Sequence, residues 1–172
     1  MRIDPIVPGS RPELARLEQQ IVAERGRISP LYQVLLHSPP LAHGWEQMLS
    51  AVRNRNSLPA GLRELIILRV AILNGAPYEF EAHVPHALAA GVAQSTIDAM
   101  REQALPAGLP LTAAERAALD YTDAMTLAII VPDPLFARVR EHFQGQSLVD
   151  LTATVAAYNM VARFLEALQI GH

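Results

Sequence analysis

Two glutamates and two histidines lie close together along residues 64 to 86, in a chain with few other groups for chemistry. Glu79 and His83 are four residues apart and His86 follows three later, so one helix would carry all three on a single face. Glu64 precedes the apolar run LIILRVAIL, where a carboxylate without partners is costly to bury. A hairpin of two helices over about 59–90 would fold Glu64 back against His83. The carboxylate would then fix the imidazole tautomer and raise its basicity, which favours a general acid–base unit.

The same residues allow other interpretations. Glu64 could lie on a narrow solvent-facing strip of its helix. Glu79, in the first turn of a helix, could serve only the helix dipole or form a surface pair with His83. Glu79, His83 and His86 could also bind a metal ion, but a single E-x-x-x-H-x-x-H is a weak signal. The paired Glu-x-x-His motifs of a di-iron site are absent from the sequence.

Four more side chains are candidates for contacting a substrate. Tyr78 comes directly before Glu79, and His86 shares the helical face of His83. Trp45 ends the turn HSPPLAHGW and could rim a pocket. Arg69 interrupts the apolar run, where it would be either a buried salt-bridge partner or a clamp for a substrate carboxylate.

The composition excludes several kinds of catalyst. The chain has no cysteine, and all 14 of its basic residues are arginines, so it has neither a thiol nor a lysine for a Schiff base. It also lacks a dinucleotide-binding glycine motif and a G-x-S-x-G elbow. Carboxylates, imidazoles, phenols and hydroxyls remain. We therefore expect acid–base chemistry on a small-molecule substrate, with no cofactor and no metal.

Charge and hydropathy bear on partners and location. The net charge is −3 and no segment collects basic residues, so we expect no nucleic-acid and no membrane partner. The N-terminus carries charges and prolines where a signal peptide needs an apolar run, and LIILRVAIL is far shorter than the roughly 20 residues of a membrane span. We expect a cytoplasmic protein. Hydrophobic residues make up 51% of the chain, which favours a homo-oligomer that buries part of its surface.

Alanine and leucine dominate, and strand-like alternation is absent, so the pattern predicts an all-α fold in a single domain over 1–172. The expected helices cover approximately 11–25, 30–37, 39–54, 59–74, 77–90, 94–104, 112–129, 133–143 and 147–169.

Several expected helix ends have a local cause. Pro59 and Pro77 suit a first helical position, where the missing N–H has no helical partner anyway. Gly75 follows an apolar run and suits a left-handed helix end. Thr112, with Glu115 three residues later, forms a capping-box pattern.

The stretch SLPAGLRELIILRVAILNGAPYEFEAHVPHALAAGV, residues 57 to 92, resembles the carboxymuconolactone decarboxylase family, which also contains the alkyl hydroperoxidase D-type proteins. The peroxidase branch carries a Glu, eleven residues, Cys-x-x-Cys, three residues and a His. The corresponding residues here are Glu64, Ala76, Glu79 and His83. The outer pair matches and both cysteines are missing. The resemblance therefore implies the cysteine-free branch, with Glu64 and His83 as a proton relay and no thiol peroxidase activity.

The resemblance also implies an all-helical fold that assembles as a trimer or hexamer, with pockets near subunit interfaces. It implies a cofactor-free lyase that decarboxylates a small carboxylated lactone or keto acid. His83 would donate the proton, Glu64 would orient it, and Glu79 would press on the departing carboxylate or share in proton transfer. The alternatives are a non-catalytic helical oligomer that binds a ligand or partner and a metal-dependent enzyme. In the non-catalytic case Glu64 would face solvent or the cavity would be collapsed.

Overall fold

The computed structural model describes residues 1–171, and His172 lies outside them. Within the described residues there are helices and no strand, so the all-α prediction is confirmed. The helices are η1 (Pro12–Leu14), α1 (Ala15–Arg25), α2 (Pro30–Leu35), α3 (Pro39–Asn54), α4 (Ala60–Leu73), α5 (Pro77–Ala89), α6 (Gln94–Met100), α7 (Ala113–Leu127), α8 (Asp133–Arg140) and α9 (Gln146–Leu168).

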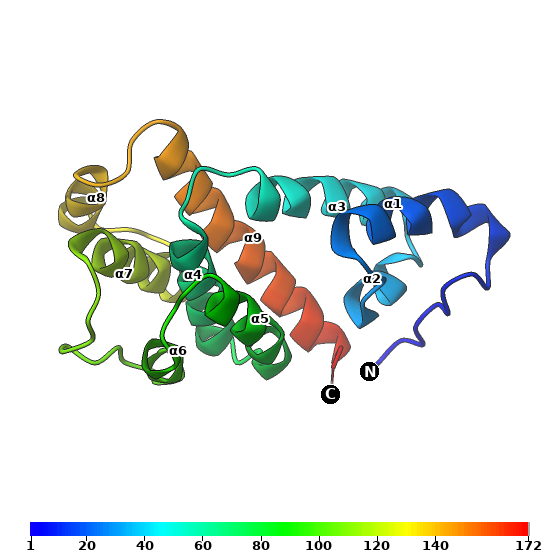
Figure 1. Cartoon of the computed structure of the whole chain (residues 1–172), viewed down its shortest axis with the longest axis horizontal. Helices are drawn as coiled ribbons and strands as arrows, with labels where there is room; N and C mark the ends of the chain where they lie inside the picture. The colour runs from blue at the N-terminus through cyan, green and yellow to red at the C-terminus, as the bar shows by residue number, and fades with distance from the viewer. Residues whose placement is uncertain (172) are drawn as a thin grey trace.

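Helix α4 is the centre of the fold and is surrounded by α5, α6, α7 and α9 (Figure 1). Every residue from Glu64 to Ala71 is buried. Apolar side chains leave α4 in two directions: Ile66 belongs to the larger apolar core and Leu68 to a smaller one that includes residues of α5, α6 and α7. A helix with no polar face is stable only when neighbours cover it on all sides. The α4–α5 hairpin predicted over 59–90 is thus fixed by burial.

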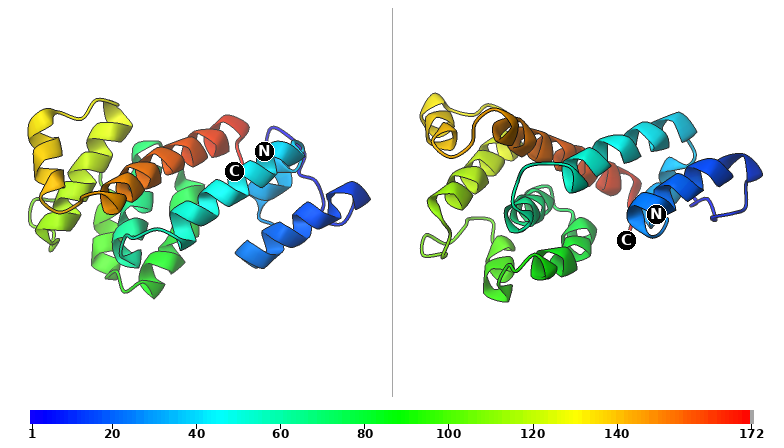
Figure 2. Two further views of the ribbon diagram at one scale, coloured as in Figure 1. Left: turned by 90° about the horizontal axis from the view of Figure 1, so that it is seen from above. Right: turned by 45° about the horizontal axis from the view of Figure 1, so that its top comes forward.

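The remaining helices extend the molecule in two directions from α4. Helices α1, α2 and α3 lie at one end and α6, α7 and α8 at the other, with α9 running between them (Figures 1 and 2). Helix α3 packs on α9 and carries α1 and α2 on it. The N-terminal segment returns to the end of α9, where the Arg2 amide donates to the Leu168 carbonyl at 2.8 Å.

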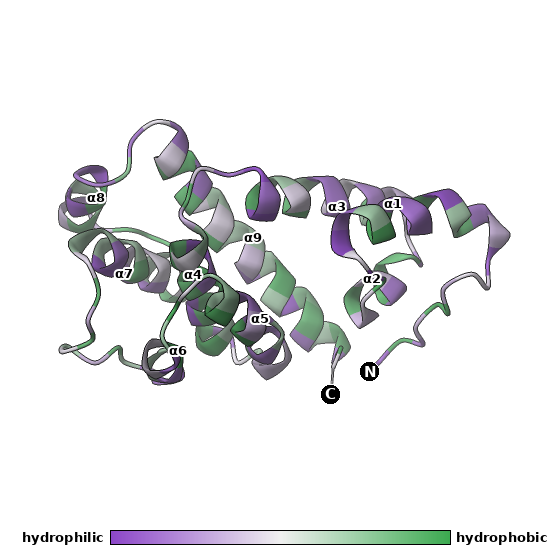
Figure 3. Ribbon diagram, in the orientation of Figure 1, coloured by the Kyte–Doolittle hydropathy of each residue, from purple (hydrophilic) through white to green (hydrophobic). Residues whose placement is uncertain are grey.

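Helix α9 is long and apolar enough, by length and composition alone, to cross a membrane, which no other helix in residues 1–171 is. Half of its most apolar window is buried inside the protein. The C-terminal half of α9 is mostly apolar in Figure 3, and it packs on α3 and α4. A buried core helix passes the same test, so this feature does not indicate a membrane span.

The local signals place most helix ends within one or two residues. Pro77 is the first residue of α5, whereas Pro59 lies one residue before α4. Gly75 has the left-handed φ of 64° that lets the chain turn from α4 into α5. Thr112 and Glu115 form the reciprocal capping box at the start of α7. These short-range predictions hold because each depends on the backbone geometry of adjacent residues.

The prediction of a helix over 94–104 is too long, because α6 ends at Met100. The segment that follows supplies backbone oxygens to a buried side chain instead. The Glu102 carbonyl accepts from Arg69 Nη1 at 2.6 Å, and the Gln103 carbonyl accepts from Arg69 Nη2 at 2.7 Å. Because these residues lie beyond the end of α6, their carbonyls are free to satisfy the buried guanidinium.

Arg69 has no exposed surface and is held by four hydrogen bonds. Besides the two carbonyls, both oxygens of Asp123 on α7 accept from it, Oδ1 at 2.6 Å and Oδ2 at 2.7 Å. A bidentate pair of this kind fixes the guanidinium in geometry as well as charge. Arg69 thereby ties α4 to α7 and to the segment after α6.

Arg69→Met should destabilise the protein by about 3 kcal/mol, because it leaves the Asp123 carboxylate and two backbone carbonyl oxygens without the donor that they now share. Chemical denaturation followed by circular dichroism would measure this. Arg138→Met is the matched control, since Arg138 pairs with Asp120 at the surface and should contribute less than about 1 kcal/mol. Equal losses for the two variants would contradict this role of Arg69.

Candidate active site

The α4–α5 hairpin brings Glu64 and His83 together. The His83 ring bonds through Nδ1 to Glu64 Oε2 at 2.7 Å. Both residues are buried, with Glu64 only 3% exposed, so the interpretation of Glu64 as part of a solvent-facing strip is wrong. No solvent-facing strip exists at Glu64, because α7 and α9 cover the faces of α4 that α5 does not cover. The two positions that match the family's relay thus form one hydrogen-bonded pair.

Glu79 approaches the other nitrogen of the same ring. Its Oε1 lies 3.4 Å from His83 Nε2, which is within ion-pair range but longer than an ordinary hydrogen bond. His83 is therefore held between two carboxylates, tightly at Nδ1 and loosely at Nε2. The looser contact is the one that a substrate atom can replace.

The charges around His83 favour its protonated form. Burial alone would lower the pKa of His83, but the hydrogen bonds and charges of Glu64 and Glu79 outweigh burial and raise that pKa above its ordinary 6.5. Burial alone would raise the pKa of Glu64, and the contact with His83 more than offsets it, so the pKa falls below its ordinary 4.5. Both shifts describe a buried carboxylate–imidazolium pair.

The metal alternative finds little support in this geometry. Both nitrogens of His83 already face carboxylates, and the His86 ring lies beside His83 with a centroid separation of 5.5 Å. Over residues 1–171, no three His, Asp or Glu side chains form a group that could hold a metal ion. The spacing of Glu79 and His83 instead brings the two side chains into ion-pair contact, and His86 lies beside the His83 ring.

A cavity of about 300 Å³ opens beside His83. One wall comes from the N-terminal helices α1 to α3, and the other from α5 and α9. It is lined by Glu24, Arg25, Arg27, Ser29, Leu31, Tyr32, Trp45, Leu49, Arg53, Asn54, Tyr78, Glu79, Ala82, His83, His86, Tyr158 and Val161. Glu64 is not among these residues. It acts on the cavity only through His83.

Three of the four substrate-binding candidates line this cavity, namely Trp45, Tyr78 and His86. Tyr78 is held in part by the C-terminal segment, because its ring lies so close to Gly171 that a Cβ there would collide with it. Arg69 is the exception, since its guanidinium is committed to Asp123 and to backbone carbonyls outside the cavity. The expectation that Arg69 contacts substrate is corrected to a structural role.

The polar residues of the cavity wall that sequence reasoning missed include Arg25, Tyr32, Arg53 and Tyr158. Tyr158 meets the His83 ring edge to face, with centroids 5.3 Å apart. A tyrosine followed by an asparagine within the apolar stretch of α9 was the available signal for it. The other three carry no such signal, because α1, α2 and α3 reach the cavity only through tertiary packing.

Glu64→Gln should lower the free energy of unfolding by roughly 1–3 kcal/mol, and the loss should depend on pH. The contribution of Glu64, whose pKa is lowered on folding, is present above pH 4.5 and disappears as the pH falls through the lowered pKa. The contribution of His83, whose pKa is raised, is full below pH 6.5 and disappears as the pH rises through the raised pKa. Denaturation at a series of pH values should therefore give the largest difference from wild type between about pH 4.5 and 6.5.

Glu81→Gln is the matched control for this measurement. Glu81 lies on the exposed side of α5 and pairs with Arg101 at the surface. Its replacement should change stability by less than about 0.5 kcal/mol. A loss in Glu64→Gln that is the same at every pH would show that the pair is not ionised.

Comparisons with known proteins agree with this fold and identify the family. The sequence model of the carboxymuconolactone decarboxylase family matches residues 39–124, which contain Glu64, Glu79 and His83. An uncharacterised protein of Bacillus subtilis (strain 168), YdfG, is 31% identical over 107 residues, which cover 61% of this chain and 71% of YdfG.

Solved structures show the same fold. The alkylhydroperoxidase AhpD core of a peroxidase-related protein from Ralstonia eutropha JMP134 has a TM-score of 0.82 and 20% identity, over 98% of this chain and 90% of that one. The debrominase Bmp8, solved with tribromopyrrole, also has a TM-score of 0.82, with 17% identity over 99% of this chain and 90% of that one. With the family match over half its length, this chain belongs to the carboxymuconolactone decarboxylase family.

Proposed function

We propose that this protein is a cofactor-free acid–base lyase that decarboxylates a small carboxylated lactone or keto acid, with γ-carboxymuconolactone as the reference substrate. The observation that carries the proposal is the buried His83, paired with Glu64 on one side and facing both Glu79 and the cavity on the other. A buried histidine with a raised pKa beside a cavity is the arrangement expected of a general acid.

The substrate supplies its own electron sink in this reaction. The bond between the ring and the departing carboxylate breaks and releases CO₂. The electron pair moves through the conjugated double bond onto the lactone carbonyl and forms a dienolate. A proton then adds to the carbon next to that carbonyl and gives the enol lactone. The protein needs only to hold the substrate, stabilise the dienolate and deliver the proton.

His83 is the proton donor in this scheme. Nδ1 is occupied by Glu64 at 2.7 Å, so the proton that can leave is the one on Nε2. Glu79 lies 3.4 Å from Nε2, where its charge opposes a second carboxylate and so favours departure of CO₂. The edge-on Tyr158 ring packs against the imidazole and limits its rotation. Glu64 is a positioning residue, because it contacts His83 and not the cavity.

Burial of Glu64 and the presence of the cavity favour this proposal over a non-catalytic scaffold. A scaffold has no need of a carboxylate that is 3% exposed and bonded to a buried histidine. The similarity in fold to an AhpD-type protein and to a debrominase does not suggest a thiol-dependent reaction here. This chain has no cysteine that could attack a peroxide or a halogen.

The test is whether the protein decarboxylates γ-carboxymuconolactone or any of a small panel of carboxylated lactones and keto acids. The release of CO₂ measures the rate. Glu64→Gln and His83→Asn should each lower the rate on the substrate that is turned over by about 10²–10⁴. The double variant should be little slower than the slower single variant, because the two groups act as one unit.

Glu81→Gln on the exposed side of α5 should keep the wild-type rate, since it contacts only Arg101. Full activity in His83→Asn would remove His83 from the mechanism. A folded wild-type protein that turns over none of the panel would favour the non-catalytic alternative.

We further propose that the protein is a cytoplasmic homo-oligomer, a trimer or hexamer, with no nucleic-acid or membrane partner. The supporting features are the high apolar content and the exposed apolar side chains of Leu127, at the end of α7, and of Ile129 and Ile130, between α7 and α8. Ile129 also has a φ of 65°, which a β-branched residue rarely adopts without an external constraint.

Light scattering at micromolar concentration should give a mass three or six times that of the 18.8 kDa chain. Ile129→Asp should shift the mass toward the monomer if this segment is part of the contact. A monomeric wild-type protein would exclude the oligomer outright.

A further inference from the structure

Three buried hydrogen-bond donors around the cavity have nothing to bond to. Four buried side-chain nitrogen or oxygen atoms in residues 1–171 lack a hydrogen-bond partner: Arg25 Nη2, Tyr32 Oη, Trp45 Nε1 and Arg63 Nε. The first three residues line the cavity, and Arg63 does not. An unpaired buried polar group costs roughly 1–3 kcal/mol, so three at one place call for a ligand that pairs with them.

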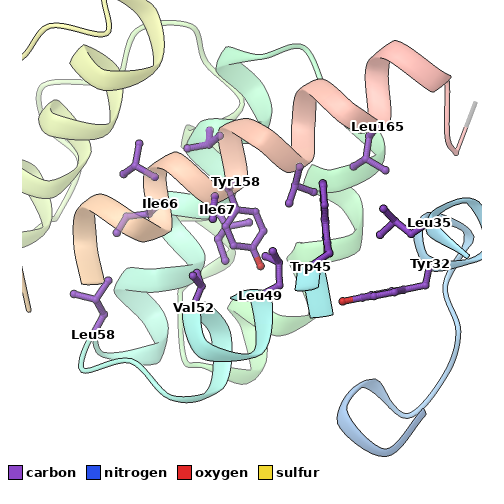
Figure 4. Packing of buried hydrophobic residues seen from close by; sticks show 14 of the residues in the cluster. Tyr32, Leu35, Trp45, Leu49, Val52, Leu58, Ile66, Ile67, Tyr158 and Leu165 are labelled. Carbon is purple, nitrogen blue, oxygen red and sulfur yellow. The ribbon is translucent and has the colours of Figure 1, made fainter. Parts of the chain in front are cut away.

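These donors come from three different helices, and their residues line one cavity. Arg25 is the last residue of α1, Tyr32 lies on α2 and Trp45 lies on α3. Tyr32 and Trp45 are each only 5% exposed, and in Figure 4 the Tyr32 hydroxyl points toward Trp45. The Arg25 Cζ lies 5.8 Å from the centroid of the Tyr32 ring. The set is therefore built by packing of the N-terminal helices, on the cavity wall that does not carry His83.

The Arg25 side chain is held in place and keeps one arm free. Its Nε donates to Glu46 Oε1 at 3.1 Å, and Glu46 also accepts from Ser50 at 2.6 Å. This anchor on α3 fixes the guanidinium plane and leaves Nη2 for a ligand. The guanidinium also lies beside the Tyr32 phenol, close enough for its approach to the hydroxyl to lower the pKa of that phenol in part, but no N–H of Arg25 meets the hydroxyl oxygen in hydrogen-bond geometry.

The chemistry of the three atoms defines what they bind. An indole N–H and a guanidinium N–H can only donate, and a phenol donates when it is protonated. Burial raises the pKa of Tyr32 to about 12 in spite of the nearby Arg25 charge, so the phenol keeps its proton at neutral pH. Anionic groups that accept several hydrogen bonds beside a cation are carboxylates and phosphates, and of these the proposed substrate carries carboxylates. Two further arginines of the cavity, Arg27 and Arg53, add positive charge, against Glu24 and Glu79.

We infer that Arg25, Tyr32 and Trp45 form a carboxylate-binding subsite on the cavity wall that faces His83 and Glu79. It deepens the proposed function by assigning the group that holds the retained carboxylate of the substrate. A substrate with two carboxylates would then be anchored by one while the other lies near Glu79 and leaves. The subsite itself requires only binding, so it can be tested without turnover.

Trp45 is the only tryptophan of the chain, so its fluorescence reports on this subsite. The probe is a saturated γ-butyrolactone carboxylate, which cannot decarboxylate because it lacks the conjugated double bond; its primary amide is the neutral counterpart. The carboxylate should change the emission of wild-type protein in a saturable way. Tyr32→Phe should weaken its binding at least about tenfold, as loss of a hydrogen bond to a charged group does, and the amide should bind more weakly than the carboxylate.

Tyr121→Phe is the matched control. Tyr121 is also 5% exposed, but its hydroxyl bonds to Thr152 Oγ1 at 3.0 Å and it does not line the cavity. Tyr32→Phe removes a hydroxyl without a partner, so it should weaken binding without lowering the unfolding free energy of the free protein. Tyr121→Phe should do the reverse. This crossed result separates a binding role from a packing role.

Unchanged carboxylate binding in Tyr32→Phe, an equal loss in Tyr121→Phe, or no saturable signal in the wild type would each overturn the subsite. Binding that depends on Tyr32 in a protein without decarboxylase activity would keep the subsite and remove only the proposed reaction. If Tyr32→Phe decarboxylates the substrate with an unchanged KM, the subsite is contradicted and the proposed reaction still stands.

Discussion

Burial of α4 from Glu64 to Ala71 is the constraint on which the rest of this structure depends. A helix covered on every side has no place for a charge unless a partner is brought to it. Two charges on α4 are buried all the same, and they are served by different parts of the chain. Glu64 is paired with His83 of α5, and Arg69 with Asp123 of α7 and the carbonyls after α6. The hairpin and the contact between α4 and α7 both follow from these requirements.

The two buried charges differ in what their partners can still do. Arg69 bonds to two carboxylate oxygens and two carbonyls, and it does not line the cavity. The Glu64 carboxylate pairs with a ring that has a second nitrogen, and that nitrogen faces a loosely placed Glu79 and the cavity. One charge fixes the fold, whereas the other keeps a titratable group protonated beside a space for substrate.

The hairpin and its acid–base residues can largely be predicted from the sequence, whereas only part of the cavity wall can. The burial of α4, the turn at Gly75 and the spacing of Glu64, Glu79 and His83 depend on residues near one another in the chain, so their pattern is readable. Arg69 is different, because a clamp and a salt-bridge partner look the same until Asp123, 54 residues away, is placed. Arg25 and Tyr32 reach the cavity through the packing of α1 and α2 on α3, which no local spacing encodes.

The residues that can be predicted from the local sequence and those that cannot also have different proposed roles in the site. The family match begins at residue 39 and contains the acid–base group, whereas Arg25 and Tyr32 precede it. The residues that we propose to move a proton lie on the α4–α5 hairpin, where burial and the Glu64–His83 bond fix their geometry. Donors that would hold a substrate come mainly from outside that segment, on helices packed around it. In such an arrangement the N-terminal helices can change the ligand while the buried Glu64–His83 pair, and the proton chemistry it permits, stays the same.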